Sequence, residues 1–89
     1  MAQIDKLIER FLRGDADANF RFDDLCSILR NLGFAERVRG SHHIFSREGV
    51  SEIVNIQPLR DGRAKTYQVR QARGILWRHG LFPGGVDEV

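Results

Sequence analysis

Two adjacent histidines are the residues of this sequence best suited to chemistry. His42 and His43 follow Gly40 and Ser41 in the stretch RVRGSHHIF. Histidine is the side chain that most readily gains and loses a proton near neutral pH, which makes it a common general acid or base. Neighbouring side chains on a strand point to opposite faces. One of the two histidines is therefore expected to face the core, and the other needs a separate explanation.

The basic residues are concentrated in the second half of the chain. The net charge is +2, but residues 35–80 hold nine Lys and Arg against four Asp and Glu. A clustered basic surface attracts phosphate polyanions such as RNA and DNA. Ordinary solvated charges explain the same distribution, and charge alone favours that simpler interpretation.

Histidines on a basic surface suit the cleavage of RNA. RNA carries its own nucleophile, the 2′-hydroxyl, so a protein has only to move protons and stabilise charge on the phosphate. Gly40 would allow the RNA backbone to come close, because it has no side chain. Arg60, Arg63 and Lys65 precede a predicted helix whose N-terminus itself favours phosphate, although a solvated loop explains these cations equally well. The residues alone still favour one packed histidine and one ordinary surface histidine over catalysis.

Other kinds of site are disfavoured. Cys26 is the only cysteine, so no intrachain disulfide or cysteine-rich zinc site is possible, and a cytoplasmic location is favoured. Cys26 lies among leucines and is expected to be a small buried hydrophobe. We expect no metal site, because His42 and His43 diverge and His79 is distant. DADAN, residues 15–19, lacks the glycine and glutamate of an EF-hand loop and is expected to be a turn.

Two further absences narrow the function. The sequence contains no phosphate-binding or dinucleotide-binding glycine motif, so no small-molecule cofactor is expected. It also contains no apolar run near the ~20 residues that span a bilayer, so no membrane association is expected.

Apolar spacing predicts the elements that position the histidines. Helical spacing predicts two N-terminal helices and one C-terminal helix, with Asp23 and Thr66 as N-caps and Trp77 in the core or at an interface. Alternation predicts a meander of three short strands between them. This α-α-β-β-β-α order is typical of an α+β domain with helices on one face of a three-stranded antiparallel sheet. The predicted helices are 4–12, 22–32 and 66–80, and the predicted strands are 34–40, 42–45 and 53–58.

Residues 23–45, DDLCSILRNLGFAERVRGSHHIF, resemble the HicA toxin family. Residues 62–76, GRAKTYQVRQARGIL, continue the resemblance, which covers most of residues 22–81. Its most specific part is the leucine-rich helix, then LGF, a short basic strand and GSHHIF. The resemblance implies a HicA-like domain similar to double-stranded-RNA-binding domains (22–81), preceded by an N-terminal helix and turn extension (1–21). The last residues, 82–89, hold a Pro and two Gly and are expected to form a flexible tail.

The resemblance also implies a function and a site. HicA proteins are ribosome-independent mRNA endonucleases of toxin–antitoxin systems, and a HicB-type antitoxin blocks them. The family's active histidine follows its Gly-Ser pair, which implies that His42 is catalytic, with His43 as the second choice. The residues expected to bind RNA are Gly40, Ser41, Arg39, Arg63 and Lys65.

Two other functions stay open. The chain could be a non-catalytic module that binds double-stranded RNA with the same fold. It could also be an interaction protein whose partner is another polypeptide, bound through Trp77 or the N-terminal helix. In the toxin interpretation that surface would be the antitoxin site.

Overall fold

The computed structural model describes residues 3–81 of the chain. The order of its elements is α-α-β-β-β-α, and the predicted α+β class is confirmed. The predicted tail at 82–89 lies outside the described residues. The elements are α1 (Gln3–Arg13), the short 3₁₀ helix η1 (Asp17–Asn19), α2 (Phe22–Asn31), β1 (Ala35–Arg39), β2 (His42–Ser46), β3 (Val54–Ile56) and α3 (Thr66–Arg78).

The three strands form an antiparallel sheet in the order β1-β2-β3. The third strand is shorter than the sequence predicts, because it ends at Ile56. The backbone N–H of Gln57 donates to the side-chain oxygen of Gln68 in α3 at 3.0 Å instead of to a strand. Pro58 then has no N–H to donate, so pairing with β2 stops there.

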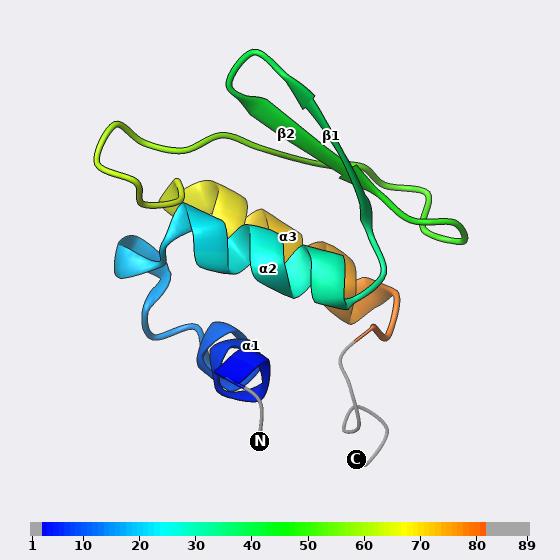
Figure 1. Ribbon diagram of the computed structural model, residues 1–89. Coiled ribbons are helices and arrows are strands. Elements are labelled where there is room, and N and C mark those ends of the chain that lie inside the picture. The colour runs from blue at the N-terminus through cyan, green and yellow to red at the C-terminus, as the bar shows by residue number, and fades with distance from the viewer. Residues whose placement is uncertain (1–2, 82–89) are drawn as a thin grey trace.

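Helices α2 and α3 cover one face of the sheet, and α1 lies on the side of the helices away from the sheet (Figure 1). The core lies between the sheet and these helices, with apolar side chains from every layer. Fully burying one such side chain contributes roughly 1.5–3 kcal/mol. The fully buried side chains include Phe11, Phe20, Leu25, Ile28, Leu29, Phe45, Ile56, Val69 and Leu76.

The DADAN segment does more than connect two helices. Asp17 is 5% exposed, and both its oxygens accept hydrogen bonds from Arg73 in α3, at 2.9 and 2.7 Å. Arg73 also donates to the backbone oxygen of Phe11 at the end of α1, at 3.1 Å. The hydrogen bonds from Arg73 lower the pKa of the Asp17 carboxyl. One buried ion pair therefore fastens the N-terminal extension to α3.

Three details differ from the sequence prediction. The N-cap of α2 is Arg21 and that of α3 is Lys65, so the predicted N-caps Asp23 and Thr66 are wrong. Trp77 is 63% exposed and does not lie in the core. The buried stripe of α3 ends at Leu76, and one further residue turns about 100° around a helix axis, away from that stripe. A role for Trp77 at an interface stays a prediction.

Among residues 3–81, no helix combines the length and the apolar character that crossing a membrane requires.

Candidate active site

The two adjacent histidines lie in different environments, as strand alternation predicts. His42 is exposed, and its Nδ1 lies 3.0 Å from Oδ1 of Asn55 in β3. His43 is partly buried beneath α2, where its Nδ1 donates to Oε2 of Glu36 at 2.7 Å. The ring of His43 also packs edge-on against Phe22, with ring centroids 4.8 Å apart. His43 is thus held on the helix-covered face, and His42 stands on the open face.

The contact with Asn55 orients the imidazole of His42. When the carboxamide oxygen accepts from Nδ1–H, the other ring nitrogen, Nε2, carries a lone pair. A neutral imidazole held this way can accept a proton from a molecule that lies against the open face of the sheet. Sequence reasoning missed Asn55 as a site residue. Its alternation with the buried Val54 and Ile56 was the available signal, because it placed Asn55 on the open face.

Gly40 and Ser41 form the two-residue loop between β1 and β2, since Arg39 pairs directly with His42. Gly40 has φ of +61°, and in residues 3–81 no residue other than glycine has a positive φ. Glycine at the first loop position with a negative φ at the second is the pattern of a type II′ turn. A Cβ at Gly40 would meet nothing within 4 Å. The backbone conformation requires glycine here, and the space beside the turn is open to a ligand.

A series of hydrogen-bonded side chains links this turn to the start of α3. Gln57 Nε2 donates to the hydroxyl oxygen of Ser41 at 3.1 Å, and Lys65 Nζ donates to Oε1 of the same Gln57 at 3.0 Å. Lys65 precedes the first residue of α3. The structure therefore brings together Ser41 and Lys65, which the sequence could only name separately. It adds Gln57, which sequence reasoning had placed in a strand without a role.

The predicted phosphate-binding arginines differ in their surroundings. Arg39 is exposed and lies opposite His42 across β1 and β2, so the two side chains share the open face. Arg37 is exposed and lies on the same face, opposite Ile44. Arg63 instead donates to Oδ2 of Asp61 at 2.9 Å and to the backbone oxygen of Ala18 at 3.0 Å. The carboxylate offsets its charge, and an RNA contact by Arg63 stays a prediction.

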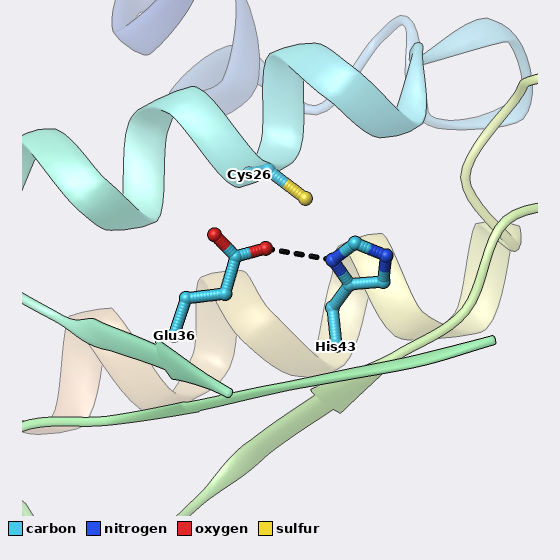
Figure 2. A group of neighbouring side chains, drawn as sticks. All are labelled: Cys26, Glu36 and His43. Carbon is cyan, nitrogen blue, oxygen red and sulfur yellow. Dashed lines mark hydrogen bonds and ion pairs between the residues drawn. The ribbon is translucent and has the colours of Figure 1, made fainter. Parts of the chain in front are cut away.

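A second cluster surrounds His43 on the other face (Figure 2). Glu36 Oε1 accepts from Arg30 at 2.8–2.9 Å, while its Oε2 accepts from His43. These hydrogen bonds lower the pKa of the Glu36 carboxyl, and the bond from His43 has the largest effect. Cys26 points toward the pair from α2, and burial raises the pKa of its thiol to about 12. The thiol is therefore protonated at neutral pH and is a poor nucleophile.

Comparison with models of protein families gives a match. A family model described as "HicA toxin of bacterial toxin-antitoxin" matches residues 22–78, more than half of the chain. The match begins at the first residue of α2 and ends at the last residue of α3. It thus contains the sheet, both helices that cover it and the candidate site, and it leaves out α1 and η1. Searches of curated proteins and of solved structures give no match.

Proposed function

Because this chain belongs to the HicA toxin family of bacterial toxin–antitoxin systems, we propose that it is an endoribonuclease in which His42 is the catalytic histidine. Toxins of the family are ribonucleases that pair with antitoxins. The proposed substrate is mRNA, cleaved without the ribosome, and the proposed inhibitor is a HicB-type antitoxin. Because mRNA is the proposed substrate, the proposed location of the protein is the cytoplasm. The proposed reaction uses no metal or other cofactor.

The observation that carries this proposal is the contrast between the two histidines. His42 is exposed beside the Gly40 turn, and its Nδ1 is engaged by Asn55. His43 is held by the Glu36 carboxylate and packed against an aromatic ring. A catalytic base has to reach the proton that it removes. Of the two, His42 is the side chain that a polymer on the surface can reach.

The proposed reaction uses the nucleophile that RNA carries. Nε2 of His42 removes the proton of a 2′-hydroxyl, and the 2′-oxygen attacks the adjacent phosphorus. The bond from phosphorus to the 5′-oxygen breaks, which leaves a 2′,3′-cyclic phosphate on one fragment. In the simplest scheme the imidazolium of His42 returns the proton to the leaving 5′-oxygen. Both proton transfers in this scheme are of the kind that histidine performs near neutral pH.

The cations on the open face have a separate role. Arg39 and Lys65 would hold phosphates on either side of the cleaved bond and stabilise the charge that develops there. Gly40 and Ser41 would admit the RNA backbone to the edge of the sheet. Domains of the double-stranded-RNA-binding kind read the shape of RNA and its 2′-hydroxyls rather than its bases. The proposal therefore includes weak sequence selection.

Cleavage of purified RNA tests the proposal. We expect the wild type to produce new RNA ends and His42→Ala to lose about 100-fold or more in rate. His43→Gln is the matched control, because its amide can still donate to Glu36, and it should cleave at a rate close to the wild type. Thermal melts establish that both variants fold. Full activity in a folded His42→Ala variant would refute the assignment, and loss of activity only in folded His43→Gln would transfer it to the neighbouring residue.

A second candidate is a non-catalytic module that binds RNA. The observation that favours it is the partner of His42, since the amide of Asn55 does not titrate and so supplies no second acid or base. Such a module would bind duplex RNA with an affinity that falls steeply with salt. The same assay distinguishes the two functions, because a module would shift the RNA in a gel without producing new ends.

A further inference from the structure

Three side chains with metal-binding atoms meet between α2 and the sheet. The Sγ of Cys26, a carboxylate oxygen of Glu36 and a ring nitrogen of His43 all lie within 4.8 Å of one another. They come from three elements, α2, β1 and β2, and Figure 2 shows the thiol pointing toward the carboxylate and the imidazole. Among residues 3–81 this is the one group of three or more such side chains found close together.

From this geometry we propose that Cys26, Glu36 and His43 form a binding site for a Zn²⁺ ion. Thiolate, imidazole and carboxylate are the three kinds of ligand that zinc takes in proteins. Zinc sites with three protein ligands are completed by a water molecule. The side chains of Glu36 and His43 are 18% and 25% exposed, so solvent can reach that fourth position.

The surroundings of Glu36 suit a metal ligand. Arg30 holds Oε1 through two nitrogens, at 2.8 and 2.9 Å, and this fixes the carboxylate with Oε2 toward His43. Such outer hydrogen bonds orient the ligands of most metal sites. The ion would take the place of the proton that His43 Nδ1 donates to Oε2, and the metal-bound neutral imidazole would carry its one ring proton on Nε2.

Two features limit the affinity of the site. The thiol of Cys26 is protonated before the ion arrives, so it has to release that proton to solvent, and binding therefore weakens as the pH falls. The guanidinium of Arg30 also places a positive charge beside the ion. The site should bind zinc less tightly than a structural site with four ligands. When occupied it would link α2 to both strands that flank the Gly40 turn, and so stabilise the fold.

The chain contains its own control for this site. Glu52 Oε2 accepts from Arg78 at 2.7 Å, and Glu52 Oε1 lies 2.8 Å from Nε2 of His79. This repeats the arrangement of arginine, glutamate and histidine around Glu36, but it is not part of the three-ligand cluster that contains the thiol. Variants of Glu52 and His79 therefore report metal binding by a partly buried histidine and carboxylate that have no thiol in their cluster.

Cobalt titration of the full chain tests the proposal. Protein carrying His42→Ala, which removes an exposed histidine that could compete, is treated with chelator and titrated with Co²⁺. We expect one equivalent to bind with the near-ultraviolet charge-transfer band of a cobalt–thiolate bond. Adding Cys26→Ser should abolish the band, whereas adding His79→Asn should leave it unchanged.

Zn²⁺ binding is then measured through the melting temperature, because a ligand that binds only the folded state raises it. Zn²⁺ should raise the melting temperature of the parent and of the His79→Asn variant, and the rise should be lost in Cys26→Ser. If Cys26→Ser does not fold, Glu36→Gln replaces it. Absence of the thiolate band in folded parent protein, or its persistence in a folded Cys26→Ser variant, would overturn the proposal. The test uses no RNA, so its result is independent of the proposed ribonuclease activity.

Discussion

Asn55 Oδ1 lies 3.0 Å from Nδ1 of His42, and this contact joins β3 to the histidine beside the β1–β2 turn. It is made on the open face of the sheet, between residues that are 13 positions apart in the sequence. An amide in this place can fix the orientation and the tautomer of an imidazole without adding charge. The contact gives Asn55 a positioning role in the proposed reaction, and that role can be separated from RNA binding.

Asn55→Leu should lower the turnover of RNA while leaving its binding intact. Leucine has a similar size but no acceptor for Nδ1–H, so the imidazole of His42 would lose its fixed orientation. We expect kcat to fall about tenfold, a part of the 100-fold or more that a general base supplies, with little change in KM. The measurement is steady-state cleavage of a short RNA. A rise in KM with unchanged kcat would show that Asn55 binds the substrate instead.

Arg39→Ala should weaken RNA binding, and it should make that binding depend less on the salt concentration. An arginine that neutralises one phosphate contributes about one unit to the slope of log affinity against log salt concentration. We expect the slope to become less negative by about that amount. Arg78→Ala is the matched control, because Arg78 is also largely exposed but is paired with Glu52. Equal slopes for Arg39→Ala and the wild type would remove Arg39 from the interface.

Substitutions of two glycines by alanine should have opposite effects on stability. Gly40→Ala places a Cβ at φ of +61°, where an L-residue is strained, and should cost about 1–3 kcal/mol. Gly74→Ala lies inside α3, where the new Cβ would approach an Arg78 nitrogen only to 3.5 Å. Alanine there should stabilise by about 0.5–1 kcal/mol. Urea unfolding measures both. A stable Gly40→Ala variant would mean that the turn tolerates another conformation.

Asp17→Asn should loosen the N-terminal extension from α3. The substitution removes a carboxylate that accepts hydrogen bonds from Arg73 and should cost about 1–3 kcal/mol. Asp15→Asn is the control, since Asp15 forms an exposed pair with Arg13 at 3.7 Å, and it should change stability by less than about 0.5 kcal/mol. Both are read from the free energy of unfolding in urea.

The same ion pair should appear in the pH dependence of stability. The pKa of Asp17 is lower in the folded chain than its ordinary value near 3.8. Its contribution is therefore fully present above that value and is lost as the pH falls through the folded pKa. We expect the stability difference between the wild type and Asp17→Asn to be constant near neutral pH and to shrink below about pH 4. A difference that grew on acidification would contradict the assignment.

Several features could be read from local sequence. The stripe of Leu25, Leu29 and Leu32 predicts α2, and Gly33 after it marks the end of the helix. Strand alternation separates His42 from His43 without any knowledge of the fold, because the period of two is a property of the backbone itself. Gly40 followed by Ser41 is a turn or bulge signal in the sequence, although the length of the loop is set by the pairing of Arg39 with His42. These features depend only on residues that lie close together along the chain.

The partners of these residues were decided by tertiary structure. Alternation could not tell which histidine faces the helices, because that depends on how α2 packs against the sheet. Asn55 reaches His42 only through the register of β2 and β3, and Arg73 reaches Asp17 across 56 positions of sequence. Cys26 is an ordinary buried residue on a leucine-rich helix until packing sets it beside Glu36 and His43. Local periodicity fixes the direction of a side chain, but a contact between distant segments depends on register and on helix packing, and the whole core sets both.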